Sequence, residues 1–181
     1  MRASGRFGIV ALALLLAAVP SAPPAAASPD GALPPVVFVV RHAEKSTPAN
    51  EPPVPLSPAG SQRAERLAAL LKDAGVASVW ATDTVRARDT AAPLARERGL
   101  DVRVYPVRDA SGQVSAAPLI DALRKDGGAA ALVVGHSNTV PKILAALGVA
   151  NPPDIPDGEY DNLFVVSTGS TGGAVAIRLR Y

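Results

Sequence analysis

Two histidines and two arginines occur in positions that suit chemistry on a phosphate group. The only histidines of the chain are His42 and His136, and each follows a short apolar run. Arg41 precedes His42, and Arg86 lies at the start of an expected helix, where backbone N–H groups also face an anion. Arginine offers paired planar donors that match phosphoryl oxygens, and it stays charged at any working pH. We therefore expect the four side chains to converge around a tetrahedral anion.

A histidine in such a cluster can act as a nucleophile. A neutral imidazole nitrogen can displace an alkoxide from phosphorus, and surrounding positive charge keeps it unprotonated by lowering its pKa. His42 is the candidate for this attack. His136, held closer to the phosphoryl oxygens, is expected to be cationic and to donate to the charge-rich transition state.

The elements that must position these side chains alternate along the sequence. Short β-branched apolar runs are separated by longer stretches with helical periodicity. Six strands are expected at 36–40, 78–81, 102–105, 131–134, 163–167 and 174–179. Helices are expected from Ser57 and Pro58, which suit a cap and a first helical position, to Gly75, and at 85–98, 116–125 and 140–147.

This alternation predicts a three-layer α/β/α sandwich with a mostly parallel six-stranded sheet. The last two strands are close enough in sequence to form a hairpin, which would make one edge antiparallel. Both histidines should then emerge at the carboxyl ends of strands, where ligands bind in such sheets. The proline-rich segment 44–57 follows the first strand and is a candidate wall or lid of the site.

Four segments, in the right order, resemble the histidine phosphatase superfamily, also called phosphoglycerate mutase-like. The stretch 36–44, VVFVVRHAE, resembles the Arg-His-Gly signature, and 56–64, LSPAGSQRA, a Leu-Thr-x-x-Gly-x-x-Gln-Ala segment. The stretch 82–91, TDTVRARDTA, resembles a Ser-x-x-x-Arg-Ala-x-x-Thr-Ala segment, and 133–140, VVGHSNTV, the second-histidine segment. Ala43 replaces the signature glycine and Arg63 stands where glutamine is usual, but neither change removes a catalytic group.

The resemblance implies a role for each matched residue. Arg41 and Arg86 bind the phosphoryl group, His42 accepts it covalently and His136 stabilises the transferring oxygens, with no metal or other cofactor required. An acidic residue that protonates the leaving oxygen usually follows the third core segment, and Asp109 resembles that position. Asp-Ala-Ser-Gly is also an ordinary turn sequence, so a turn is the alternative.

Several neighbouring residues have two readings. Arg88 competes with Arg86, but the spacing to the Thr-Ala pair favours Arg86. Glu44 and Lys45 either contact substrate or are solvated at a loop entrance. Ser137 and Asn138 cap the following helix or orient His136. The acids of 158–161 either line the pocket or belong to a polar loop before a strand, which is sufficient to explain them. A two-histidine metal site is disfavoured, because neither histidine has ligand spacing and the arginines would repel a cation.

The first residues have the pattern of a secretory signal. Arg2 and Arg6 precede an apolar run at 8–19, and the small residues 25–27 follow. The run is too short to span a membrane, so we expect cleavage after residue 27, no stable membrane insertion and a secreted or periplasmic protein. Residues 28–34 read as a disordered lead, and 35–181 as one phosphatase domain.

Composition excludes several other classes of function. The net charge of +2 is accounted for by the two arginines of the signal, so no nucleic-acid partner is indicated. The absence of cysteine excludes a disulfide, a thiolate nucleophile, a cysteine-ligated metal and a cysteine-linked lipid.

The sequence thus predicts a metal-independent phosphatase that hydrolyses phosphate monoesters, small or surface-linked, through a phosphohistidine intermediate. The chain lacks the long insertions with which phosphoglycerate mutases enclose their substrate, so transfer to water is favoured over mutase activity. Two alternatives stay open, a non-catalytic phosphate-binding module of the same fold and a phosphohistidine protein phosphatase. The sequence chooses neither a natural substrate nor an oligomeric state.

Overall fold

One six-stranded sheet forms the centre of the molecule. The computed structural model describes residues 31–46, 53–169 and 173–181. The strands are ordered β3-β2-β4-β1-β5-β6 across the sheet. Their bounds are β1 (Val36–Arg41), β2 (Val76–Ala81), β3 (Val102–Val104), β4 (Ala130–Gly135), β5 (Asn162–Ser167) and β6 (Val175–Arg180).

Strand directions confirm the expected mostly parallel sheet. Strand β1 pairs in parallel with β4, and β2 pairs in parallel with both β4 and β3. Strand β5 runs antiparallel to β1 and to β6. The hairpin β5-β6 therefore forms the antiparallel edge that the short connection predicts.

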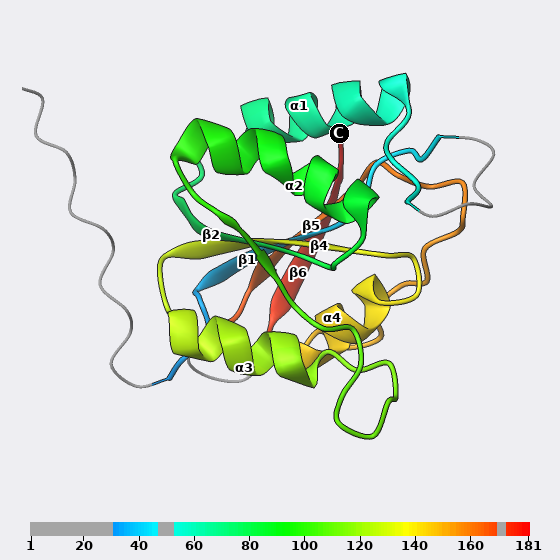
Figure 1. The fold of residues 1–181 in the computed structure, drawn as a ribbon. Helices are drawn as coiled ribbons and strands as arrows, with labels where there is room; N and C mark the ends of the chain where they lie inside the picture. The colour runs from blue at the N-terminus through cyan, green and yellow to red at the C-terminus, as the bar shows by residue number, and fades with distance from the viewer. Residues whose placement is uncertain (1–30, 47–52, 170–172) are drawn as a thin grey trace, which may run out of the picture.

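Helices cover both faces of the sheet, which confirms the three-layer architecture. Figure 1 shows α1 and α2 on one face and α3 and α4 on the other. Their bounds are α1 (Pro58–Leu71), α2 (Val85–Arg98), α3 (Ala117–Asp126) and α4 (Val140–Ala146). No helix in the described part of the chain is long and apolar enough to cross a membrane.

Local signals set the ends of the first two helices. Ser57 caps α1, and its hydroxyl oxygen accepts a hydrogen bond from the Gly60 amide at 3.1 Å. Helix α2 ends where Gly99 adopts the left-handed conformation with φ of 65°. Ser57 thus sets the start of α1, and Gly99 sets the end of α2.

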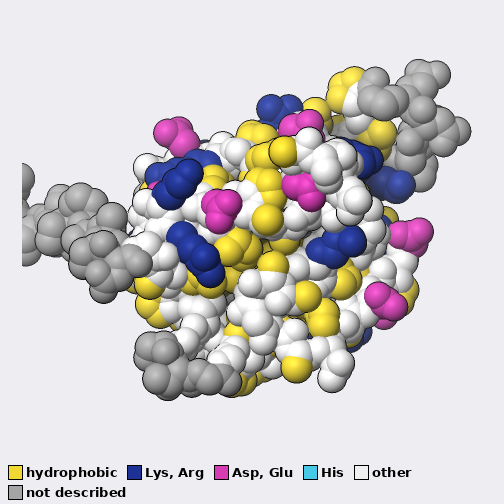
Figure 2. Space-filling view, turned by 90° about the horizontal axis from the view of Figure 1, so that it is seen from below, with side chains coloured by type: hydrophobic (Ala, Val, Ile, Leu, Met, Phe, Trp, Pro, Cys, Tyr) yellow, Lys and Arg dark blue, Asp and Glu magenta, His cyan; other side chains and the backbone are white. Residues whose placement is uncertain are grey.

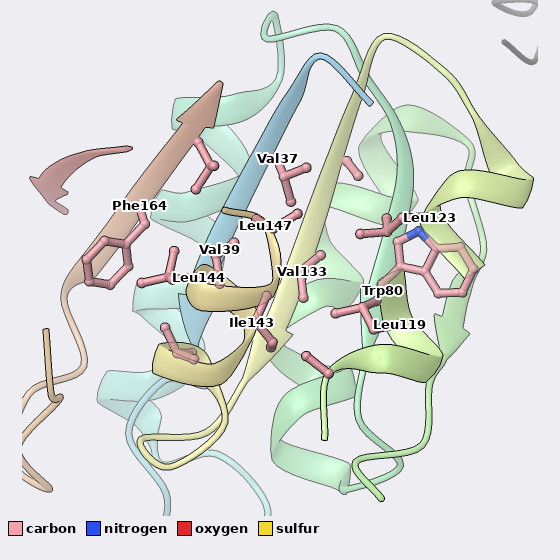
Figure 3. Packing of buried hydrophobic residues seen from close by; sticks show 14 of the residues in the cluster. Val37, Val39, Trp80, Leu119, Leu123, Val133, Ile143, Leu144, Leu147 and Phe164 are labelled. Atoms are coloured by element: carbon pink, nitrogen blue, oxygen red, sulfur yellow. The ribbon is translucent and has the colours of Figure 1, made fainter. Parts of the chain in front are cut away.

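The sheet has a separate apolar core on each face, because alternate residues of its buried strands point to opposite sides. Leu67 of α1 and Leu94 of α2 belong to one core, together with Val40 of β1. Figure 3 shows the other, where Val39 lies beside Leu144 of α4. Burying one such side chain stabilises the fold by roughly 1.5–3 kcal/mol. The two cores fix the strands whose carboxyl ends bear the site.

The face seen from below in Figure 1 offers no single-sign charge patch in its described part. Figure 2 shows basic and acidic side chains interspersed there among apolar and uncharged ones, with no histidine visible. His42 and His136 directly follow the carboxyl ends of β1 and β4.

Candidate active site

The register of β1 and β4 brings the two imidazoles together. Arg41 pairs with Gly135 at the ends of these strands, so His42 and His136 occupy equivalent next positions. The His42 amide donates to the Gly135 carbonyl at 2.9 Å. The two ring centroids are 5.2 Å apart, with the planes inclined at 66°. The expected convergence of the histidines is thus a consequence of strand pairing.

The hydrogen bonds of His42 define its tautomer. Its Nδ1 lies 2.7 Å from the Ala43 carbonyl oxygen, which can only accept, so Nδ1 carries the proton. Nε2 is then left with a lone pair, and the Arg86 Nε–H donates to it at 3.1 Å. The unprotonated nitrogen of His42 therefore faces a guanidinium, which is also a ligand for phosphoryl oxygens.

Burial keeps His42 neutral. The side chain is only 3 % exposed, and desolvation, with smaller contributions from His136 and two arginines, lowers its pKa from 6.5 to about 3. The Ala43 carbonyl opposes this shift by accepting from the ring. At neutral pH the imidazole has the charge state that a nucleophile requires.

His136 is neutral in the free site, which differs from the cationic state expected from sequence. Its pKa is lowered from 6.5 to about 4, mainly by burial and then by Arg86 and Arg41, while Asp83 opposes the shift. Its Nε2 lies 2.9 Å from the Thr82 hydroxyl oxygen, and its backbone amide donates to Thr139 Oγ1 at 2.8 Å. A neutral ring still supplies one N–H donor, and a bound phosphate dianion favours the protonated form.

Arg41 is anchored by a loop that sequence reasoning assigned no role. Its Nη1 donates to the carbonyls of Pro156, Asp157 and Glu159 at 2.8–3.1 Å. The guanidinium lies over the Tyr160 ring, 4.2 Å from its centroid, and that ring is 6.0 Å from the ring of His42. The buried Arg41 Nε has no protein partner within the described residues, so it is free to meet an anion.

The loop residues also link the two histidine turns. The Ser137 hydroxyl donates to the Asp157 carboxylate at 3.2 Å, and Asp157 forms a 3.6 Å ion pair with Arg41. These loop contacts were not predicted, because every residue has a main-chain carbonyl and the sequence therefore does not show which carbonyls will bind Arg41. The one available signal was Tyr160, an aromatic side chain inside an otherwise polar loop.

Helix α2 joins the nucleophile turn through Thr90. The Ala43 amide donates to Thr90 Oγ1 at 3.0 Å, and Thr90 donates to the Arg86 carbonyl at 2.7 Å. Arg86 therefore contacts His42 directly, whereas Arg88 is exposed. The geometry assigns the inner position to Arg86, the residue that the motif spacing favoured. Ala43, in place of the signature glycine, is completely buried.

A partly buried ion pair fixes the chain just after His42. Arg63 donates to both carboxylate oxygens of Glu44, with Nε at 2.9 Å from each. This hydrogen bonding lowers the pKa of Glu44, and Arg63 also contacts the Tyr181 backbone oxygen at 2.5 Å. Glu44 is thus held by α1 and does not remain free for substrate. Lys45 forms only an isolated bridge with Leu56.

The expected proton donor Asp109 lies in a turn, the alternative that its sequence left open. Its carboxylate accepts from the Ser111 amide at 2.9 Å, the Ser111 hydroxyl at 2.6 Å and the Gln113 amide at 3.1 Å. These bonds, the Ser111 hydroxyl first, lower the pKa of Asp109 and favour its ionised form. In the described structure none of its hydrogen bonds reaches the histidines or Arg86, so the turn explains it.

A cavity of about 430 Å³ opens beside Arg86. Its lining includes Pro53 and Val54 from the loop after β1, together with Asp83 and Arg88. The described end of the proline-rich segment thus forms one wall, as expected, whereas residues 47–52 lie outside the described part. The cavity provides space for the organic part of a phosphate ester.

No cluster of three or more metal-binding side chains occurs in residues 31–46, 53–169 and 173–181. The site as described is instead a pair of neutral imidazoles flanked by two guanidiniums. It can bind a tetrahedral anion and present a nucleophilic nitrogen to it.

Comparison with known proteins finds a family that matches part of the chain. Residues 37–107 match the histidine phosphatase superfamily, branch 1. The matched stretch contains Arg41, His42 and Arg86 and ends before His136. A search among curated proteins found no match.

Solved structures of phosphatases share the fold. The protein histidine phosphatase SixA in complex with tungstate is 22 % identical with a TM-score of 0.63, covering 80 % of this chain and 96 % of its own. A phosphohistidine phosphatase SixA from Agrobacterium tumefaciens is 22 % identical with a TM-score of 0.60, covering 82 % and 98 %. A mycobacterial glucosyl-3-phosphoglycerate phosphatase is 19 % identical with a TM-score of 0.53, covering 72 % and 89 %.

The structure is an α/β protein with imidazoles and guanidiniums converging at the carboxyl edge of a mostly parallel sheet. Residues 37–107 are similar in sequence to the histidine phosphatase superfamily, branch 1, and the fold is similar to those of solved phosphatases. The sequence match reaches three of the four segments that carry the resemblance and, with the shared fold, supports phosphatase activity.

Proposed function

We propose that this protein hydrolyses phosphate monoesters through a phosphohistidine formed on His42. The observation that carries the proposal is the state of His42, a buried neutral ring whose Nε2 lone pair faces Arg86. Arg86 and the free Nε of Arg41 supply the positive charge that binds the phosphoryl oxygens. The same charges disfavour protonation of the nucleophile.

The proposed reaction has two in-line displacements. First, His42 Nε2 forms a bond to phosphorus while the bond from phosphorus to the leaving oxygen breaks. The Ala43 carbonyl, which accepts from Nδ1–H, stabilises the positive charge that develops on the ring. Second, water attacks phosphorus, the P–N bond breaks, and inorganic phosphate leaves. In both steps an N–H of His136 donates to the phosphoryl oxygens.

The test is hydrolysis of p-nitrophenyl phosphate in the presence of a metal chelator, comparing wild type with His42→Ala. We expect activity in wild type and a loss of at least about 1,000-fold in the variant. A phosphoryl adduct that is stable to alkali and labile to acid should be trapped on wild type alone. Equal background rates in both proteins would reject catalysis and leave the non-catalytic phosphate-binding module.

Arg88→Ala provides a matched control for Arg86→Ala, because both arginines lie on the first turns of α2. Removing Arg86 deletes a charged donor beside the nucleophile and should lower kcat/KM by about 100-fold. Removing the exposed Arg88 should change it by less than about threefold. Similar losses in the two variants would contradict the assigned role of Arg86.

A phosphohistidine protein is a second candidate substrate. Its support is the similarity to the two SixA structures, which this chain matches over most of their length. Comparing kcat/KM for a phosphohistidine-bearing protein with values for a panel of phosphate esters decides between the two classes. A clear preference for the phosphoramidate would replace the monoesterase proposal.

We also infer that the protein acts outside the cytoplasm as a mature chain beginning near residue 28. The support is the signal-like pattern of residues 1–27, which lie outside the described part of the structure. Amino-terminal sequencing of protein recovered from a secreting host should give a chain that begins at Ser28. Recovery of uncleaved cytoplasmic protein would contradict export.

A further inference from the structure

The proposed reaction requires a proton at the leaving oxygen. An alkoxide is a poor leaving group, so a positioned acid contributes typically 10²–10⁴-fold to such a step. Asp109 does not fill this role, since its carboxylate is bound by three donors of its own turn. A carboxyl group elsewhere must lie where the leaving group emerges.

The position of His42 sets the direction in which the leaving group departs. The nucleophile is almost fully buried at the floor of the site, and in-line displacement places the leaving oxygen on the opposite side of phosphorus. The leaving group therefore points outward, toward the rim. An acid that protonates it must lie at the open side and not beside the nucleophile.

Asp83 lies at this rim, between two cavities. It borders the cavity of about 430 Å³ that Arg86 and Val54 also line. It also borders a cavity of about 470 Å³ lined by Tyr105 and Pro106. Its side chain is exposed, so it can reach a substrate that enters from either cavity.

The backbone around Asp83 is tied to the catalytic floor. Thr82 is completely buried, and its hydroxyl lies 2.9 Å from His136 Nε2. The hydroxyls of Thr82 and Thr84 are 3.2 Å apart, so the residues on both sides of Asp83 are linked. The negative charge of Asp83 also raises the pKa of His136 against the effect of burial. Asp83 therefore lies near the histidine expected to contact the phosphoryl oxygens.

Within the described part of the chain, three other carboxylates near the site have assigned partners. Glu44 is bound by Arg63, and Asp157 is shared between Ser137 and Arg41. Glu159 accepts from Asn162 and pairs with Arg178. Asp83 combines exposure with a place in the lining of the cavity beside Arg86.

We propose that Asp83 is a catalytic residue that protonates the leaving oxygen of the ester, an inference that rests on the proposed monoesterase function. As His42 Nε2 bonds to phosphorus and the P–O bond breaks, the proton of the Asp83 carboxyl group moves to the departing oxygen. The carboxylate formed then takes a proton from the water that attacks the phosphohistidine. One alcohol and one phosphate are released, and the protein returns to its starting state.

The test compares esters whose leaving groups differ in their need for a proton. Asp83→Asn keeps the shape of the side chain but cannot supply the acid. For an alkyl ester such as glycerol phosphate, we expect kcat to fall by about 100-fold or more. For p-nitrophenyl phosphate, whose leaving group departs as a stable anion, the loss should stay within about threefold.

A matched variant, Asp109→Asn, removes a carboxylate outside the proposed proton path. Its ratio of alkyl to aryl ester hydrolysis should equal that of wild type. Asp83→Asn should bind inorganic phosphate as tightly as wild type, which reports an intact folded site. If Asp83→Asn still hydrolyses p-nitrophenyl phosphate, the nucleophile functions. The proposed function is tested separately by His42→Ala, so either proposal can fail without the other.

Three results overturn the proposal. An undiminished rate of Asp83→Asn on the alkyl ester removes any role in proton transfer. Equal losses on alkyl and aryl esters assign Asp83 to holding His136 in place. A selective loss on the alkyl ester in Asp109→Asn, and not in Asp83→Asn, transfers the role to Asp109.

Discussion

The turn after β1 and the loop after β3 leave parallel strands in the same sheet, yet they are held in different ways. The first turn is tied to three other elements, through Gly135 of β4, Thr90 of α2 and the α1 residue Arg63. The carboxylate of Asp109, in the second loop, bonds only to residues two and four positions further along. Long-range bonds fix a side chain for chemistry, whereas short-range bonds complete a turn.

The largest effect is expected for His136→Ala, which removes a hydrogen-bond donor next to the nucleophile turn. We expect turnover of p-nitrophenyl phosphate to fall by about 100-fold, because a hydrogen bond to the transition state is lost. Ser137→Ala, at the adjacent position, where the hydroxyl bonds to Asp157 and not to His136, is the control and should stay within about threefold of wild type. A value for His136→Ala within that same range would show that its role is misassigned.

Gly60→Ala probes the packing that supports the nucleophile turn. A Cβ at this position would lie 2.1 Å from the Glu44 carbonyl oxygen, too close for the backbone to remain in place. We expect a loss of about 2 kcal/mol in the free energy of unfolding, measured by urea denaturation. Gly158→Ala is the control, since a Cβ there meets nothing within 4 Å. Equal stability of the two variants would contradict the close contact of α1 with the turn.

The pH dependence of stability reports the buried histidines. Their pKa values are about 3 and about 4 in the folded protein, against 6.5 for an unperturbed ring. Between these values the unfolded chain binds more protons, so the free energy of unfolding falls as pH drops below about 6.5. From pH 7 to pH 5 we expect His42 to contribute a loss of about 2 kcal/mol.

The matched measurement is the same pH series on His42→Gln, which cannot titrate. Carboxylates of the chain affect both proteins alike, so the difference between the two curves isolates the histidine. The variant should lose less stability on acidification. Parallel curves would show that His42 is not desolvated. The contrast between the turn after β1 and the loop after β3 would then be weaker.

The smallest effect is expected for Asp109→Asn. The asparagine side-chain oxygen can still accept from the Ser111 and Gln113 amides that the carboxylate now binds. Turnover of p-nitrophenyl phosphate should therefore stay within about twofold of wild type, and stability within about 0.5 kcal/mol. A large loss of turnover would place Asp109 in the reaction and remove the contrast on which the comparison rests.

Most of the fold was predictable because local and global signals agree. Helix α2 has the predicted bounds, since Gly99 supplies the stop, and the other elements lie within a few residues of expectation. The β-branched runs predicted the buried strands, and the alternation of these runs with helical segments predicted the parallel sheet. The predicted signal and residues 28–30 of the expected lead at 28–34 fall outside the described residues, so they stay predictions.

The candidate site was predictable only in part. Motif order indicated Arg41, His42, Arg86 and His136, which the strand register brings together. The neutral state of His136 was not predictable, because desolvation depends on packing that the sequence does not display. The loop around Arg41 was missed for a related reason, since its contacts are made by main-chain oxygens.

The way in which Arg41 is held has a consequence for how the sequence of this protein can diverge. Carbonyl groups are present in every residue, so side chains at 156, 157 and 159 can change while the three bonds to Arg41 survive. A one-residue deletion or insertion would instead shift all three oxygens at once. The three bonds to Arg41 should therefore tolerate a change of residue type in this loop better than a change of its length.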